Sequence, residues 1–395
     1  MQALLTIAAL GAVLWAAALL ASGIGLWTLW REPVLRRPIL IFESDDWGPG
    51  PAWHAGRLAS LRALLLRFRD AGGAPPVMTL GMVLAIPRPA PEGALIGLHD
   101  PAFQSIRDAI RGGVEAGVFT VQLHGEAHFW PAALAAAAAD SAPLKAWLAS
   151  ADNWQSEALP PGLQSRFAPE LPDRAFPMQA ADIEDAAWRE ALHFAECFGA
   201  APAVAVPTTF VCNDAALRGW RRGGVRFVVT PGRRYRSRRD FNRGAPRVAN
   251  GSVRRGLLQV VRDVYFEPVK GHRALDVLPA LEARFERGRP ALLEIHRVNF
   301  LDEAQQRNSE AELASLLERA LHSFPGLRFL STQALAEAIA AGTADLIERD
   351  PANRLRTCLR RARERSRLWK LASWTGLGAL LGACARGGAR GLEPS

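Results

Sequence analysis

Cysteine is scarce in this 395-residue chain, and its spacing excludes two kinds of stabilised small fold. The four cysteines lie far apart and include no C-x-x-C pair. A disulfide framework and a zinc knuckle are therefore excluded. We predict that the thiols pack as small apolar side chains. The sequence also lacks a glycine-rich phosphate loop and an internal repeat.

Charge is absent from the N-terminal segment. Residues 2–30 contain no Lys, Arg, Asp or Glu, and this run exceeds the roughly 20 residues that cross a bilayer. No basic residue precedes the run, which disfavours the alternative of a cleaved secretory signal. We therefore predict a single transmembrane helix over residues 1–30 and a location in the cell membrane. Three arginines follow within seven residues, and the positive-inside rule then places the following domain in the cytoplasm.

Positive charge is concentrated in two patches. Residues 218–255 hold 13 Arg and one Asp, and residues 354–370 hold seven Arg, one Lys and one Glu. The whole chain has a net charge of +9, so the rest of it is acidic. Nucleic acid is not an expected partner, because the basic residues are clustered and no reader motif is present. We interpret residues 354–395, a basic segment followed by a short apolar one, as a tail that contacts membrane lipid; a solvated tail is the alternative.

Short apolar runs alternate with segments of helical periodicity over residues 38–345. The predicted strands are residues 39–42, 77–83, 119–123, 204–206, 226–230, 257–264, 292–295 and 327–330. The predicted helices are residues 58–68, 103–114, 132–149, 183–198, 214–221, 274–285, 310–324 and 332–341. Residues 152–178 are rich in proline and are predicted to form an inserted loop. Strands that are each followed by a helix or a long loop indicate one α/β domain built as a parallel barrel.

Acidic and imidazole side chains follow the strands of this predicted barrel. Asp45 and Asp46 come directly after the first strand, His124 ends the third strand, and His128 lies four residues further on. His296 ends the strand at residues 292–295. Barrel enzymes place their chemistry at the C-terminal ends of the strands. Three separate strands therefore deliver titratable residues to one rim.

These residue types fit a divalent-metal site. An H-x-x-x-H spacing places both imidazoles on one face of a helical turn. Two imidazoles and one carboxylate leave open positions on the metal, which then polarises a substrate oxygen and lowers the pKa of bound water. Of two adjacent carboxylates, one can bind the metal while the other accepts a proton from the attacking water. Zinc suits this donor set, and iron, cobalt, nickel and manganese are also compatible with it.

Three segments resemble motifs of the polysaccharide deacetylase superfamily, also called carbohydrate esterase family four. They are IFESDDWG at residues 41–48, HGEAH at residues 124–128 and LEIH at residues 293–296. The resemblance covers about residues 38–342 and implies a distorted seven-stranded β/α barrel. It implies Asp45 as the base and His296 as the acid. It implies Asp46, His124 and His128 as the metal ligands.

The chain departs from that family at several positions, as a divergent branch would. Trp47 is inserted before the glycine of the first motif, and the fourth motif has no counterpart. The third motif is echoed only by residues 206–210, which lack its arginine. Backbone N–H groups of Thr209 or Phe210 could serve there as oxyanion donors.

Two further groups of residues are predicted to contact the substrate. Trp47 offers an aromatic face for a sugar ring, with core packing as the alternative. Arg297 and Asn299 follow the last motif and are assigned to orienting or substrate contacts, with a surface-loop role as the alternative.

The predicted function is metal-dependent hydrolysis of acetyl groups from N-acetylated sugars of a glycan or a lipid-linked glycan. The first basic patch follows strands near the proposed rim and favours an anionic substrate, since arginine binds phosphate and carboxylate through paired hydrogen bonds. A metal-independent glycoside hydrolase with paired carboxylates is one alternative. A non-catalytic sugar-binding membrane protein is the other.

Overall fold

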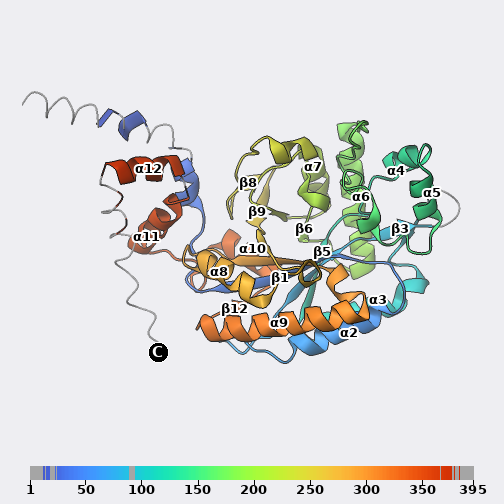
Figure 1. The fold of residues 1–395 in the computed structure, drawn as a ribbon, viewed down its shortest axis with the longest axis horizontal. Helices are drawn as coiled ribbons and strands as arrows, with labels where there is room; N and C mark the ends of the chain where they lie inside the picture. The colour runs from blue at the N-terminus through green and yellow to red at the C-terminus, as the bar shows by residue number, and fades with distance from the viewer. Residues whose placement is uncertain are drawn as a thin grey trace, which may run out of the picture.

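A parallel sheet forms the centre of the molecule (Figure 1). The computed structural model describes residues 12–13, 15–17, 23, 25–88, 94–364, 366–375, 378 and 382. Within them the strand order is β10-β11-β1-β2-β5-β6-β7-β9-β8, and β12 pairs with β1 outside this path. The strands are β1 Ile39–Trp47, β2 Met78–Met82, β5 Phe119–Leu123, β6 Val204–Ala205, β7 Phe227–Thr230, β8 Val253–Arg254, β9 Leu257–Val261, β10 Val264–Tyr265, β11 Ala291–His296 and β12 Arg328–Phe329.

The sheet curls strongly, because one segment of chain reaches both of its ends. Residues 257–265 contribute β9, which pairs in parallel with β7, and β10, which pairs in parallel with β11. Arg262 and Asp263 separate the two short strands. The predicted α/β class and the barrel-like arrangement of parallel strands are confirmed.

Helices cover the outside of the curled sheet, and Figure 1 shows α2 and α9 side by side along one face. The longer helices are α2 His54–Leu65, α3 Gln104–Glu115, α4 Pro131–Ala138, α5 Ala142–Ala149, α6 Ala180–Phe198, α7 Asp214–Arg222, α8 Ala274–Phe285, α9 Glu303–Ser323, α10 Thr332–Ala341, α11 Pro351–Ala362 and α12 Ser366–Trp374. A separate antiparallel hairpin joins β3 Ala85–Pro87 to β4 Leu95–Gly97.

Alternation along β1 separates an apolar layer from a polar one inside the curl. Ile39 and Ile41 pack in the smaller interior cluster with Leu335 of α10. Their neighbours along the strand point outward into the large cluster beneath the helices. The same period of two carries Glu43 and Asp45 inward at the C-terminal end of β1, and both carboxylates are buried. The interior is therefore apolar at one end of the curl and charged at the other.

Three details differ from the sequence-based expectation. The helix predicted over residues 132–149 is two helices, because Ser141 caps α5 by accepting a hydrogen bond from the N–H of Leu144. The strand predicted over residues 257–264 is interrupted at Arg262. The β3–β4 hairpin had no predicted counterpart.

The predicted membrane location is corrected by the structure. Among the residues described here, no helix is both long enough and apolar enough to cross a bilayer. Residues 1–11, 14, 18–22 and 24 of the predicted 1–30 span lie outside the described part of the chain.

One arginine of the second basic patch is internal. Arg361 of α11 is fully buried. Its guanidinium donates to the carbonyl oxygens of Glu32, Pro33 and Gly288 at 2.8 to 3.1 Å. Arg361 therefore joins α11 to the segment before β1 and is not available to lipid.

Candidate metal centre

Asp46, His124 and His128 meet at the C-terminal rim of the sheet. Both histidine Nε2 atoms lie 3.3 Å from Asp46 Oδ1, and all three side chains are buried. Asp46 adopts a positive φ of 73°, at an irregularity in the β1–β2 register. A left-handed residue turns its side chain out of the strand alternation. As a result, adjacent Asp45 and Asp46 direct their carboxylates to different partners.

Asp46 Oδ1 is spaced from both imidazole nitrogens as a shared cation requires, and the three ligand atoms all lie within 4.8 Å of one another. Nitrogen and oxygen atoms about 2.0–2.1 Å from a zinc ion lie about 3.3 Å apart at the tetrahedral angle. Although Asp46 Oδ1 is this close to both imidazoles, it is buried without an aligned hydrogen bond from any described residue. His124 Nδ1 is held by the carbonyl oxygen of Val206 at 3.0 Å, which leaves Nε2 for a metal. These residues therefore fit a divalent cation.

Arg262 lies at the centre of the carboxylates beside this cluster, and sequence reasoning missed it. Its Nη2 donates to Asp45 Oδ2 at 2.6 Å. Nη1 lies 3.1 Å from Glu43 and Nε lies 3.2 Å from Glu294, as ion pairs rather than aligned hydrogen bonds. An arginine at the end of the apolar run 257–261 was the available signal.

The pKa shifts in this network separate the carboxyl groups by role. Burial raises the pKa of Glu43 and Glu294 above the ordinary value, despite the charge of Arg262. Burial also acts to raise the pKa of Asp45, but the charges of Arg262 and His124 and the Arg262 hydrogen bond lower it overall. Asp45 is therefore the carboxylate of this group that stays ionised most readily.

Glu267, a second residue that sequence reasoning missed, holds His296 in place. Glu267 accepts hydrogen bonds from His296 Nδ1 and, at 3.2 Å, from the His296 backbone N–H. Burial alone would lower the pKa of His296, but the Glu267 hydrogen bond and the charges of Asp46, Glu267 and Glu294 raise it to about 10. His296 is thus protonated at neutral pH. Glu267 follows β10 by two residues, and no motif marks it.

A cavity of about 750 Å³ opens onto these groups. Asp45, Asp46, His124, His128 and His296 all line it. Thr209 and Phe210 also line it. The Phe210 N–H donates to the carbonyl of Pro207 at 2.9 Å, whereas no described residue accepts from the Thr209 N–H. Of the two N–H groups, that of Thr209 is therefore the one left available to a ligand in the cavity.

The other predicted substrate contacts lie away from this cavity, so the structure gives their proposed role no support. Trp47 is fully buried and donates to Ser44 Oγ at 2.8 Å. Arg297 is buried against the carbonyl of Trp154 at 2.6 Å and pairs with Glu157. Asn299 is buried and donates to Glu267. None of these three side chains lines the cavity, and proximity in sequence to a motif does not reveal where a side chain points.

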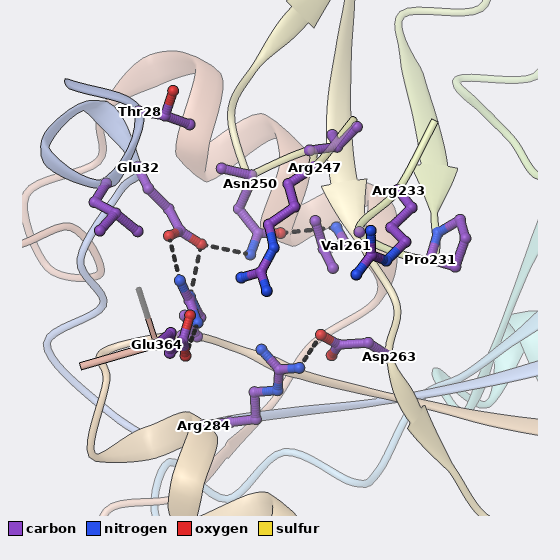
Figure 2. A pocket seen from close by; sticks show the side chains of 15 residues that line it. Thr28, Glu32, Pro231, Arg233, Arg247, Asn250, Val261, Asp263, Arg284 and Glu364 are labelled. Atoms are coloured by element: carbon purple, nitrogen blue, oxygen red, sulfur yellow. Dashed lines mark hydrogen bonds and ion pairs between the residues drawn. The ribbon is translucent and has the colours of Figure 1, made fainter. Parts of the chain in front are cut away.

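A second cavity, of about 360 Å³, lies between the segment before β1, α8 and the loop before β8 (Figure 2). Figure 2 shows Arg284 paired with Asp263, and Glu32 bonded to Asn250. Glu32 also receives two hydrogen bonds of 2.8 Å from Arg289. Acidic side chains neutralise much of the arginine charge of this cavity. The resulting network of ion pairs joins the segment before β1 to α8, to the loop before β8 and to Glu364, which follows α11.

No family model matches the chain, and no curated protein sequence matches it. Among solved structures it is similar to a 4-α-glucanotransferase from Thermococcus litoralis, with TM-score 0.42 and 9% identity over 78% of this chain and 41% of that one. It is similar to a family 4 carbohydrate esterase from Streptomyces lividans in complex with acetate, with TM-score 0.35 and 13% identity over 74% and 91%. It is also similar to a peptidoglycan deacetylase from Bacillus subtilis, with TM-score 0.36 and 11% identity over 85% and 98%.

Several of the similar structures are family 4 carbohydrate esterases or polysaccharide deacetylases, at low identity. The chain spans 41% of the glucanotransferase. The identities and TM-scores are too low for function to follow from the likeness. The function proposed below therefore depends on the geometry of the site.

Proposed function

We propose that this protein is a metal-dependent hydrolase that removes acetyl groups from N-acetylated sugars. The observation that carries the proposal is the placing of Asp46 Oδ1 3.3 Å from the Nε2 atoms of both His124 and His128, beside an ionised Asp45. His296 lines the same cavity and is protonated. A base and an acid with opposite pKa shifts, beside a set of metal ligands, suit hydrolysis of an amide.

Each side chain has one task in this proposal. Asp46, His124 and His128 would hold the cation, which supplies Lewis acidity to the acetyl carbonyl and lowers the pKa of water. Asp45, kept ionised by Arg262, takes the proton of the attacking water. The Thr209 N–H donates to the oxygen of the tetrahedral intermediate. His296 is held at Nδ1 by Glu267 and donates its Nε2 proton to the departing nitrogen.

The walls of the cavity favour a sugar that carries negative charge. Tyr235, Phe241 and Tyr265 line it and provide aromatic faces, which pack well against sugar rings. Arg238 and Lys270 also line it and would bind a phosphate or carboxylate of the substrate. Tyr265 ends β10, and the other four residues lie in segments that follow strands.

The glycoside hydrolase alternative has less support. It needs two carboxyl groups that flank a glycosidic bond. Glu43 is buried on Arg262 and Thr332, and Glu126 is bonded to His193 on the outer side of the rim. Among Glu43, Glu126 and Glu294, only Glu294 lines the cavity.

We expect the purified protein to release acetate from N-acetylated oligosaccharides, and to do so faster when the sugar carries a phosphate or carboxylate. A chelator should lower the rate at least about 100-fold, and added zinc should restore it, because the cation activates both water and carbonyl. Acetate release with neutral and anionic substrates, before and after metal removal, measures both effects. Cleavage of glycosidic bonds that a chelator does not affect would instead support the alternative enzyme.

A further inference from the structure

A second group of ligand-type side chains lies apart from the candidate catalytic cavity. His193 and Cys197 are one turn apart on α6, and His99 follows β4 by two residues. One ligand atom from each lies within 4.8 Å of the other two. His99 Nδ1 and His193 Nε2 are 2.9 Å apart. Three residues from two distant segments thus direct nitrogen and sulfur atoms at one point.

The two histidine pairs of this protein have closely similar geometry. The ring centroids of His99 and His193 are 5.0 Å apart with planes at 69°, and those of His124 and His128 are 5.2 Å apart at 59°. In each pair one ring is fixed by a protein oxygen at Nδ1. His193 Nδ1 lies 2.9 Å from a carboxylate oxygen of Glu126. Likewise, His124 Nδ1 lies 3.0 Å from the carbonyl oxygen of Val206. An outer oxygen of this kind orients an imidazole whose other nitrogen binds a metal.

The packing around His99 favours a fixed arrangement of the rings. A Cβ on Gly97 would lie 2.7 Å from the His99 ring and 2.8 Å from the His193 ring, so glycine is needed for their close approach. His99 is exposed, whereas His193 and Cys197 are half-buried. Solvent can therefore occupy a remaining coordination position.

We propose that His99, His193 and Cys197 bind a second divalent cation of the zinc class. Imidazole and thiolate donors select zinc over magnesium or calcium. Three protein ligands and water suit a site that is weaker than closed sites with four protein ligands. A cation there would join α6 to the segment that follows the β3–β4 hairpin.

The position of this site relates it to the candidate catalytic loop. Glu126 lies between His124 and His128, and its carboxylate bonds to His193. The Glu126 backbone N–H donates to Glu190, also on α6, at 3.1 Å. A cation on His193 would therefore steady the loop that carries two ligands of the first site. It would be a positioning site and would take no part in the reaction.

Cobalt absorbance separates the two sites, because only the second has a sulfur ligand. Metal-free full-length protein is titrated with Co²⁺, and we expect two equivalents bound and a thiolate-to-cobalt charge-transfer band in the near ultraviolet. Cys197→Ser should remove the band and one equivalent. His124→Ala should remove the other equivalent and keep the band. Cys212→Ser, the same change at a buried cysteine two residues before α7, should keep both.

The proposal is overturned if the wild type shows no charge-transfer band, or if Cys197→Ser keeps it. A thermal unfolding measurement separately tests the positioning role, in which the second cation steadies the loop that carries His124 and His128. Zinc should raise the unfolding midpoint of His124→Ala, which retains only the second site, and should not raise that of His124→Ala combined with His99→Ala. An unfolding midpoint of His124→Ala that zinc does not change would overturn the positioning role. None of these readouts depends on acetate release, so loss of the proposed deacetylase function would leave them interpretable.

Discussion

Asp45→Asn is expected to lower kcat for acetate release by about 10³- to 10⁴-fold while leaving the metal content unchanged. The amide cannot accept the proton of the attacking water, and general-base catalysis contributes up to about 10⁴-fold. Asp45 is not among the three clustered metal-ligand candidates, so the cation site should persist. Initial rates and metal analysis on the same preparation measure the two quantities.

Asp345→Asn provides the matched control, since Asp345 is exposed and distant in the chain from every motif. It should retain full activity. If Asp45→Asn retained more than about a tenth of the wild-type rate, another residue would have to be the base. If it lost the metal as well, Asp45 would belong to the ligand set.

Arg262→Gln is expected to lower the free energy of unfolding by about 3–5 kcal/mol, the usual cost of removing one partner of a buried ion pair. Glu43, Asp45 and Glu294 would be left close together without the guanidinium that lies between them. Urea unfolding at neutral pH measures the loss. Arg226→Gln is the control, because its side chain is 56% exposed in its pair with Glu337, and such pairs contribute at most about 1 kcal/mol.

The same arginine sets the pH range of the base. The pKa of Asp45 is lowered in the folded protein, so its contribution to stability is present above its unfolded pKa and is lost as pH falls through the folded one. Arg262→Lys keeps the positive charge, but the single lysine nitrogen cannot make all three contacts with Glu43, Asp45 and Glu294. We expect it to fold, with the acidic limb of kcat/KM moved to higher pH. An acidic limb at the wild-type position would show that Arg262 does not tune the base.

The candidate site could be predicted from sequence where chemistry and strand ends coincide. Asp46, His124 and His128 each follow a strand of a parallel sheet, and parallel strands end at one rim. Their meeting at 3.3 Å is a consequence of topology. Local spacing was sufficient because Asp46 and His124 lie at the ends of β1 and β5 and His128 follows His124 by four residues.

The supporting residues could not be predicted in the same way. Arg262 contacts β1 only because the sheet curls until residues 257–265 meet both of its ends. Glu267 acts through a tertiary hydrogen bond to His296. Trp47 lies within one motif and Asn299 follows another, yet both side chains are buried, and position in the sequence alone does not reveal this. The apolar N-terminal run suggested a membrane span by composition, which the described helices do not provide.

Metal analysis of the full-length protein beside His124→Ala tests the central claim most directly. The Asp46, His124 and His128 cluster should bind one cation, and His124→Ala should contain one equivalent fewer than the wild type while remaining folded by circular dichroism. Equal metal content in the two proteins would contradict the account, because the three side chains would then meet without gripping a cation.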